Sequence, residues 1–227
     1  MSRYPTVVAV PDLHEPWSKK SAVKKLYDHI DRINPDHVIQ LGDALDRFSF
    51  SRFAKHPIGM TPEEEIDEGH QCLGRFWANV RLAAPKARLI QLSGNHEARL
   101  VRACLERFPE ALSLLSRAQG DFYSFKGVET IHDHRHELEI GGVVYCHGWL
   151  GALGAHMRYL GKPVVHGHTH RGGFVAESWH GRTIWELDCG YLGDKDAVPL
   201  MYGPTKTVKW VLGYGLVDRF GGRFVGL

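Results

Sequence analysis

Residues able to bind metal ions occur in five short clusters, and each follows a run of apolar residues. The clusters are Asp12-Leu13-His14, Gly42-Asp43, Gly94-Asn95-His96-Glu97, His147-Gly148 and His166-Gly167-His168-Thr169-His170. Their carboxylate, amide and imidazole groups offer oxygen and nitrogen ligands, with no thiolate among them. Such a set suits Mn²⁺, Fe, Zn²⁺ or Ni²⁺. The chemistry to be expected is therefore that of a bound transition metal.

Each cluster alone has an ordinary structural explanation. An aspartate after a strand is often a turn residue, and His147 alone would more often be a hydrogen-bonded core histidine than a ligand. The run at residues 166–170 can be a solvated, histidine-rich loop. Five such clusters in succession, beside glycines that let backbone segments approach closely, are hard to obtain by packing alone. We therefore expect the five to form one site.

The apolar runs before the clusters are typical of buried β-strands. They span residues 6–10, 38–41, 88–92, 142–146 and 163–165, and a further run spans 183–187. Each is short and bounded by glycine, proline or polar residues. Ligand sites in open α/β folds gather at the carboxyl ends of strands, which is where the clusters lie.

Helical patterns separate these strands. Thr61 is a favourable N-cap, Pro62 suits the first helical position, and Glu64 is placed to close a capping box. Apolar residues recur at helical spacing after Thr61 and also within residues 18–33 and 100–108. The alternation predicts an α/β fold, and we expect one domain spanning residues 1–227 because no linker or repeat divides the chain.

The composition is that of a folded intracellular protein. The chain has 43% hydrophobic residues, and its net charge of +2 argues neither for nor against an anionic partner. Its cysteines, Cys72, Cys104, Cys146 and Cys189, form no CxxC pair, which predicts buried thiols, with a disulfide as the alternative. There is no signal-peptide pattern and no apolar run of the about 20 residues that cross a bilayer. We expect a cytoplasmic protein with no membrane partner and no obligate protein partner.

The order of the clusters resembles the calcineurin-like metallophosphoesterase superfamily, whose signature is D-x-H, GD, GNH[D/E], H and GH-x-H. All five elements occur here in that order between Asp12 and His170, so the resemblance covers most of the chain. It implies an α/β fold of two mixed β-sheets packed as a sandwich and flanked by helices, an αββα arrangement. The family often has an Asn-rich or Gly-rich closing loop where this chain has Asp188-Cys189-Gly190-Tyr191, a loose match.

The resemblance also implies a binuclear metal centre. Asp12, His14 and His170 would hold one divalent ion, and Asn95, His147 and His168 the other, with Asp43 bridging ions roughly 3.5–4 Å apart. We expect Mn²⁺, with Fe, Zn²⁺ or Ni²⁺ as alternatives. The neutral amide of Asn95 would limit the negative charge that an anionic substrate meets. A water shared by the ions, its pKa lowered from about 15.7 towards 7, would attack phosphorus in line with the ester bond.

Two further residues would complete the catalysis. In the family the histidine of GNH[D/E], here His96, faces the substrate and binds no metal, so it would give a proton to the leaving oxygen. Residues 42–47 resemble the GD-x-x-D-R-G element of protein serine/threonine phosphatases, in which Asp46 would orient His96 and Arg47 would bind phosphate. Phe48 and Ser93 depart from that branch, and the alternatives are a helix cap for Asp46 and a surface ion pair for Arg47.

Other polar residues lie close to the clusters. Asn95 and Arg99 are candidates to contact the phosphate, with a helix-surface position as the alternative for Arg99. Residues 132–136, with the sequence HDHRH, precede a predicted strand, so we expect a solvated loop at the edge of the cleft rather than a further metal site. Residues 48–56 interleave aromatic and basic side chains, which could stack bases or pack into the core.

The signature indicates a reaction class rather than a substrate. The compact layout resembles phosphodiesterases and nucleases of bacteria and their phages, so the expected substrate is a phosphodiester, with DNA, RNA or nucleotides foremost. The alternative is a phosphomonoesterase acting on phosphoprotein or a nucleotide, which Asp46, Arg47 and Glu97 favour. A non-catalytic scaffold is a third hypothesis, and the presence of all the ligand positions argues against it.

Overall fold

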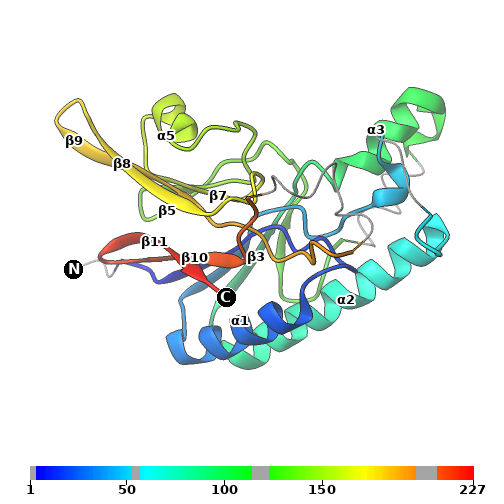
Figure 1. The fold of residues 1–227 in the computed structure, drawn as a ribbon, viewed down its shortest axis with the longest axis horizontal. Helices are drawn as coiled ribbons and strands as arrows, with labels where there is room; N and C mark the ends of the chain where they lie inside the picture. Colours follow the sequence, from blue (N-terminus) through cyan, green and yellow to red (C-terminus); the bar gives the residue numbers. More distant parts are fainter. Residues whose placement is uncertain (1–3, 53–56, 114–122, 198–208) are drawn as a thin grey trace.

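A computed structural model of the chain describes residues 4–52, 57–113, 123–197 and 209–227. Two mixed β-sheets pack face to face between helices (Figure 1). The predicted fold class, a sandwich of two mixed sheets flanked by helices, is confirmed. No helix in the described part of the chain combines the length and apolar character needed to span a bilayer.

The first sheet has the strand order β11-β10-β1-β2-β3-β4. Its strands are β1 (Val7–Val10), β2 (His37–Gln40), β3 (Arg88–Leu92), β4 (Glu129–Ile131), β10 (Gly213–Asp218) and β11 (Gly221–Gly226). β1 to β4 are parallel, whereas β10 is antiparallel to β1 and to β11. The parallel strands therefore direct their carboxyl ends to one edge of the sheet.

The second sheet has the order β5-β6-β7-β9-β8. Its strands are β5 (Leu138–Ile140), β6 (Val143–Tyr145), β7 (Val164–His166), β8 (Gly173–Trp179) and β9 (Arg182–Asp188). β6, β7 and β9 are parallel, and the two edge strands run antiparallel to them. Like the first sheet, it has a parallel centre whose carboxyl ends lie together.

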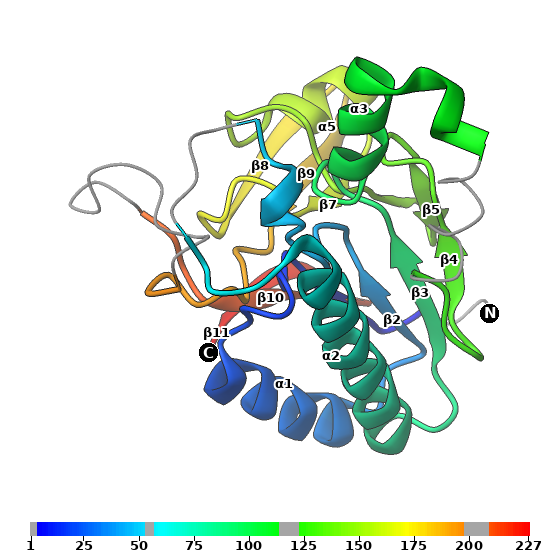
Figure 2. The ribbon, with the colours of Figure 1, turned by 90° about the vertical axis from the view of Figure 1, so that its right-hand side faces the viewer.

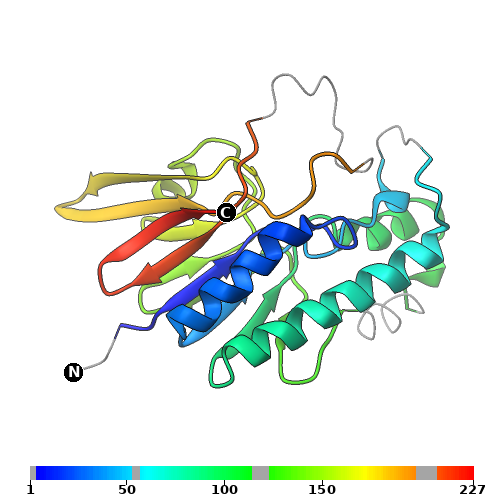
Figure 3. The same ribbon diagram turned by 60° about the horizontal axis from the view of Figure 1, so that its bottom comes forward.

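Helices cover the outer faces of both sheets. α1 (Lys20–Ile33) and α2 (Pro62–Ala83) run side by side along the first sheet (Figures 2 and 3). α5 (Ala155–Leu160) packs on the second sheet, and α3 (Ala98–Arg107) follows β3. Two short 3₁₀ turns, η1 (Phe48–Phe50) and η2 (Pro109–Ala111), complete the described helices.

The pattern of β1 explains why the chain forms these layers. Successive side chains of a strand point to opposite faces. Val8 and Val10 pack among the residues of α1 and α2, while Val7 and Ala9 enter the core between the sheets. Since both faces are buried, the strand needs a continuous apolar run rather than an alternating one. The sequence supplies that run.

The helix signals agree with the structure at α2 and differ at α1. Thr61 caps α2, its side chain accepting from the backbone N–H of Glu64 while Glu64 bonds back to the N–H of Thr61. The predicted capping box is confirmed. α1 begins at Lys20 rather than Ser18, because the Ser18 hydroxyl donates to Glu15 instead of capping the helix. All four cysteines are buried thiols, as expected.

Candidate metal centre

The five clusters meet where the carboxyl ends of the two sheets converge. β1, β2 and β3 of the first sheet lead into the clusters at Asp12, Asp43 and Asn95. β6 and β7 of the second sheet lead into His147 and the run at residues 166–170. Within each of three groups, the ligand atoms all lie within 4.8 Å of one another. The groups are Asp12, His14 and His170; His14, Asp43 and His96; and Asp43, His147 and His168.

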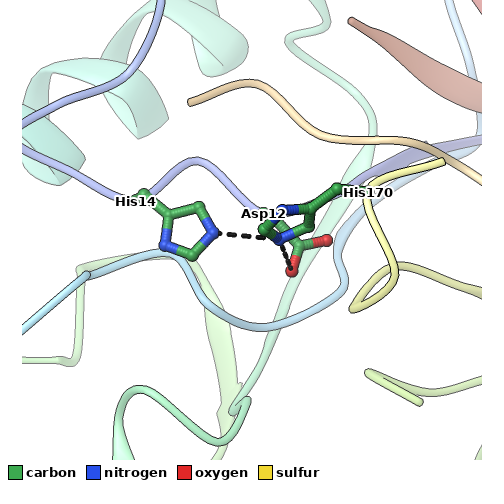
Figure 4. A group of neighbouring side chains, drawn as sticks. All are labelled: Asp12, His14 and His170. Carbon is green, nitrogen blue, oxygen red and sulfur yellow. Dashed lines mark hydrogen bonds and ion pairs between the residues drawn. The ribbon is translucent and has the colours of Figure 1, made fainter. Parts of the chain in front are cut away.

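One half of the site is formed by Asp12, His14 and His170 (Figure 4). The Nε2 atoms of His14 and His170 are 3.2 Å apart, and Nε2 of His170 lies 3.4 Å from Oδ1 of Asp12. Asp12 and His14 are fully buried, and His170 nearly so. These donor atoms point at one another from two different sheets.

The other half contains Asp43, Asn95, His147 and His168. Nε2 of His147 lies 3.3 Å from Oδ2 of Asp43, 3.1 Å from Oδ1 of Asn95 and 3.2 Å from Nδ1 of His168. Asp43 belongs both to this group and to the group containing His14. It therefore lies between the two halves, where a bridging carboxylate would have to be.

The crowding around His147 tests whether this donor set fits a metal ion. Its Nδ1 lies 3.2 Å from the carbonyl oxygen of Leu41, which can only accept, so Nδ1 carries a proton. In the neutral ring Nε2 is then an electron pair, and it faces a carboxylate, an amide oxygen and another imidazole nitrogen. A single added proton cannot satisfy three such neighbours. A cation among them can, and the residues fit a bound metal ion.

Asp46 orients His14 much as the carbonyl of Leu41 orients His147. Its Oδ2 lies 3.0 Å from Nδ1 of His14, which directs the other ring nitrogen of His14 towards His170. A carboxylate behind a histidine fixes the tautomer that presents a free Nε2 to a metal. Burial alone would raise the pKa of Asp46, but the charge of His96 and the contact with His14 bring that pKa below its usual value.

The electrostatics show a site that attracts positive charge. Burial would raise the pKa of Asp43, but the charges of His147 and His96 leave that pKa well below its usual range. Burial opposes charging of His147, yet the Asp43 carboxylate raises the pKa of this histidine to about 9. Burial and the charge of His147 lower the pKa of His168 to about 4. His147 thus holds one proton, and bound cations would displace that proton.

Four of the candidate ligands have left-handed backbone conformations. φ is 52° at His14, 50° at Asp43, 69° at His168 and 61° at His170. For residues with a Cβ atom this conformation costs about 1–2 kcal/mol each. Such strain persists only where the surroundings enforce it, and it gathers at functional sites. Here it turns side chains from successive loop residues into one small volume.

Two glycines make the close approach of these loops feasible. Gly42 has φ +104°, and a Cβ there would lie 2.7 Å from the backbone nitrogen of Gly94 and 2.9 Å from Nδ1 of His147. A Cβ at Gly167 would overlap the carboxylate of Asp12. Any larger residue at either position would push a candidate ligand out of place.

Glu97 holds the loops after β2 and β3 together. Its carboxylate accepts from the backbone N–H groups of Asp43, Leu45 and Gly94, at 3.0, 2.9 and 2.7 Å. Burial and the charge of Asp43 raise the pKa of Glu97. The sequence indicated Glu97 only as a motif match, and the structure gives it a physical task.

His96, Asp46 and Arg99 form a buried chain of contacts. Nδ1 of His96 lies 3.6 Å from Oδ2 of Asp46, and Nη1 of Arg99 donates to Oδ1 of Asp46 at 2.9 Å. Nη2 of Arg99 is 2.6 Å from Nε2 of His96, which therefore accepts. Asp46 is closer to His14 than to His96, so it supports a candidate ligand as well as the predicted dyad. Arg99 is buried at the site rather than lying on the helix surface.

The structure does not bring Arg47 to the substrate side. Its side chain is only 3% exposed, and Nη1 donates to the carbonyl oxygen of Glu97 at 2.6 Å. It does not line the cavity beside the site. The expectation that Arg47 binds phosphate is therefore corrected, because its guanidinium is used to hold the start of α3.

A cavity of about 590 Å³ opens beside the second half of the site. Asn95, His147 and His168 line it, whereas Asp12, His14 and His170 do not. The loop at residues 132–136 borders it through the exposed side chains of His134 and Arg135, which agrees with a solvated loop at the cleft edge. The remaining lining residues are Ser51, Arg52, Arg99, Arg102, Glu137, Gly148, Trp149 and Tyr159.

The aromatic and basic stretch at residues 48–56 contributes little aromatic surface here. Phe48 is buried with its ring 6.5 Å from that of Trp17, the core-packing alternative for this residue. Ser51 and Arg52 reach the cavity. Residues 53–56, which include Phe53, Lys55 and His56, lie outside the described residues.

A second buried carboxylate, Glu186 on β9, was not singled out from the sequence. Its Oε1 accepts from the N–H of Gly154 at 2.8 Å and lies 3.1 Å from Nε2 of His166; its Oε2 accepts from the N–H of Met157 at 2.8 Å. Nδ1 of His156 is 3.4 Å from the same Oε1. These three side chains lie close enough to hold a metal, but hydrogen-bond partners already surround them.

This network positions the loops that carry His147 and His168. Nε2 of His156 accepts from the backbone N–H groups of Trp149 and Leu150, at 3.0 and 3.1 Å. Nδ1 of His166 donates to the carbonyl of Gly167 at 2.8 Å. Burial opposes charging of His166, but its hydrogen bond to Glu186 raises its pKa. Only the long-range pairing of β7 with β9 could have revealed this, because nothing local marks Glu186.

Two aromatic rings contact His170, and no sequence motif predicts them. The ring of Tyr191 stacks on His170 with centroids 5.2 Å apart, and Trp210 meets it edge-on at 4.8 Å. The backbone N–H of Val211 donates to the carbonyl of His170 at 2.9 Å. Tyr191 and Trp210, rather than an Asn-rich loop, thus cover the first half of the site at His170.

Comparisons with known proteins identify relatives but no assigned family. No family model matches the sequence. "Gene 54 protein" of Mycobacterium phage D29 is 26% identical over 232 residues, covering 93% of this chain and 88% of that protein. The protein of the same name from Mycobacterium phage L5 is 25% identical over 230 residues, with the same coverage. The chain is therefore similar over most of its length to two phage proteins whose names state no activity.

Solved structures give a weaker likeness. Vacuolar Protein Sorting 29 from Cryptosporidium parvum has a TM-score of 0.43 at 14% identity, covering 95% of this chain and 85% of that one. Vps29 of Chaetomium thermophilum has the same TM-score at 10% identity, covering 95% and 80%. These TM-scores are too low to carry any inference about function.

The donor geometry predicts two divalent ions per chain. After dialysis against Mn²⁺ and then metal-free buffer, elemental analysis should find about two equivalents in the native protein and at most one in Asp43→Ala, because Asp43 lies between both halves. If the ions exceed their Kd about 100-fold, each bound ion adds about 2.7 kcal/mol and raises Tm by roughly 5–10 °C. Asp31→Ala, on the exposed side of α1, is the matched control. Equal metal content in Asp43→Ala and Asp31→Ala would contradict the bridging position.

The Glu186 network predicts a loss of stability from a single-atom change. In the native protein both oxygens of Glu186 accept backbone N–H groups. In Glu186→Gln an amide N–H₂ replaces one of these oxygens, and each buried donor left unpaired costs about 1–3 kcal/mol of stability. Tm should fall by several degrees, and the site should retain less metal. Glu177→Gln is a matched control on neighbouring β8, because its partner is the exposed Arg158. Glu186→Gln with native Tm and native metal content would show that the network positions nothing.

Proposed function

We propose that this protein is a binuclear metal-dependent phosphoesterase of the calcineurin-like superfamily, acting on phosphodiesters of nucleic acid or nucleotides. The observation that carries the proposal is the convergence of Asp43, Asn95 and His168 on Nε2 of His147. The ordered sequence motifs support it independently, because each motif supplies residues to the same small volume.

In this proposal the residues would divide between two ions as the resemblance implies. Asp12, His14 and His170 form one group, Asn95, His147 and His168 the other, and Asp43 contacts both. When bound, divalent ions would supply Lewis-acid activation of water and neutralise charge on the phosphate. Mn²⁺ is our proposal for the ions, because a donor set of nitrogen and oxygen suits it.

His96 is the proposed proton donor to the leaving oxygen. Its ring nitrogens lie 3.6 Å from Oδ2 of Asp43 and 3.6 Å from Oδ2 of Asp46, and our assignment does not use it as a ligand. In the structure Arg99 donates to Nε2 of His96. Proton transfer from that nitrogen requires Arg99 to turn away and Nε2 to take up a proton from solvent, and a bound phosphate offers the guanidinium of Arg99 a better partner.

The cavity favours diesters over monoesters. It extends from the second half of the site and carries several arginines, so it can hold groups on both sides of a scissile phosphate. The monoesterase alternative depended in part on Arg47 as a phosphate ligand, and Arg47 is buried against Glu97. A non-catalytic scaffold would need neither the strained ligand conformations nor the gathering of donor atoms around Nε2 of His147.

The first test compares esters that share a leaving group. We expect bis(4-nitrophenyl) phosphate to be hydrolysed faster than 4-nitrophenyl phosphate with Mn²⁺ present, and single- or double-stranded DNA or RNA to be cleaved. A chelator and the Asp43→Ala substitution should each remove nearly all activity, while Asp31→Ala should retain it. Preference for the monoester without nucleic-acid cleavage would favour the phosphomonoesterase. Full activity with the chelator or in Asp43→Ala would contradict the metal centre itself.

The second test examines His96. General-acid catalysis contributes typically about 10²–10⁴-fold, and only where the leaving group needs a proton. His96→Ala should therefore lose much more activity on an alkyl ester than on a nitrophenyl ester, with metal content unchanged. Asp46→Asn is a less selective probe because Asp46 also contacts His14. Equal losses on both esters, or missing metal in His96→Ala, would assign His96 another role.

A further inference from the structure

The cavity beside the metal centre has strongly cationic walls. Arg52, Arg99, Arg102 and Arg135 line it, against one acidic residue, Glu137. Nη2 of Arg102 donates to the carbonyl of Asn95 at 3.2 Å, which fixes this arginine close to the candidate ligands. Guanidinium groups bind phosphate in a bidentate manner and also stack on flat rings. The wall is therefore suited to a phosphorylated ligand longer than one phosphate.

Two exposed aromatic side chains form another part of the same wall. Trp149 is 40% exposed and Tyr159 is 72% exposed, and their ring centroids are 6.0 Å apart at 85°. Both line the cavity. Trp149 follows the candidate ligand His147 by two residues, so its ring lies beside the site. Exposed aromatic surface next to cations is the composition that binds unpaired nucleobases.

The backbone of Trp149 is held firmly. Its N–H donates to Nε2 of His156 at 3.0 Å, and its ring meets the ring of His156 edge-on at 4.9 Å. His156 is itself fully buried and contacts Glu186. A side chain supported in this way is pre-organised, which reduces the entropy lost when a ligand stacks on it.

We propose that this cavity binds an unpaired nucleotide adjacent to the scissile phosphate of single-stranded nucleic acid. The base stacks on Trp149, and Arg102 and Arg135 hold the neighbouring phosphate. A base must leave a duplex to reach such a ring, so the subsite selects single strands. The assignment of the scissile phosphate rests on the proposed function, because Asn95, His147 and His168 line the same cavity. Base stacking and phosphate binding do not need the metals.

The first experiment measures binding without catalysis. Fluorescence anisotropy of labelled hexathymidylate and hexauridylate, in excess chelator, should show that Trp149→Ala weakens binding about 5- to 150-fold, since stacking is worth about 1–3 kcal/mol per base. Trp149→Phe should recover most of the affinity. Phe220→Ala, which removes an 80% exposed ring outside the cavity, is the control and should bind like the native protein.

The arginines are tested by the salt dependence of the same binding. Loss of one phosphate contact in Arg135→Ala should reduce the slope of log K against log salt by about 0.7. Arg219→Ala, which changes an arginine next to Phe220, should leave the slope unchanged. Equal affinity in Trp149→Ala and Phe220→Ala would overturn the subsite. Tighter binding of a short duplex or a phosphoserine peptide than of either hexamer would overturn the choice of ligand.

A second experiment separates this inference from the proposed function. Thymidine 5′-(4-nitrophenyl phosphate) and methyl 4-nitrophenyl phosphate share the reacting bond and the leaving group, and differ in the nucleoside. Trp149→Ala should raise KM for the thymidine ester and leave the methyl ester unaffected. Equal effects on both esters would overturn the subsite while the phosphoesterase stands. Trp149-dependent binding of the hexamers without hydrolysis of any ester would overturn the phosphoesterase while the subsite stands.

Discussion

The rest of this structure depends on one constraint, which is the repulsion among electron-pair donors. These donors are gathered where the carboxyl ends of the two sheets converge. Asp12 and Asp43 are buried carboxylates, and the nitrogens of His147 and His168 face them and each other. Burying such groups together is unfavourable unless positive charge lies among them. The raised pKa of His147 means that a proton on this ring supplies part of the positive charge. Bound cations would relieve this repulsion, and the surrounding hydrogen bonds hold the donors in place against it.

Each sheet stabilises its own part of the site with one buried carboxylate. Glu97 accepts backbone N–H groups from the loops after β2 and β3, and Glu186 does so for the segment that follows β6. Both use side-chain oxygens where no regular backbone partner exists, since the loops are strained and leave N–H groups unpaired. The two carboxylates differ in charge compensation. Glu186 is paired with His166, whereas Glu97 is buried close to the negative Asp43, and burial together with that charge raises the pKa of Glu97.

Local patterns in the sequence predicted most elements that hold the site. Residues 88–92 form β3 with the expected bounds, and the capping box at Thr61 is present, because both depend on near neighbours. The β10–β11 hairpin was not predicted: its glycine-rich strands have little intrinsic preference and form through pairing with β1. The placement of Arg47 and of Glu186 was also beyond reach, since each depends on residues distant in the chain. The clusters themselves were predictable because each one directly follows the strand that positions it.

The two halves of the site differ in accessibility, and this determines where a substrate can approach. Tyr191 and Trp210 cover His170, so the half that contains Asp12 is closed. The other half opens to the cavity through Asn95, His147 and His168. In that half His156 links the candidate ligand His147 to the cavity wall. Glu186 supports His156, and His156 in turn holds the backbone of Trp149, which follows His147 by two residues. The network that holds the loops of His147 and His168 therefore also holds part of the wall that a substrate would meet, so a change in Glu186 would affect both.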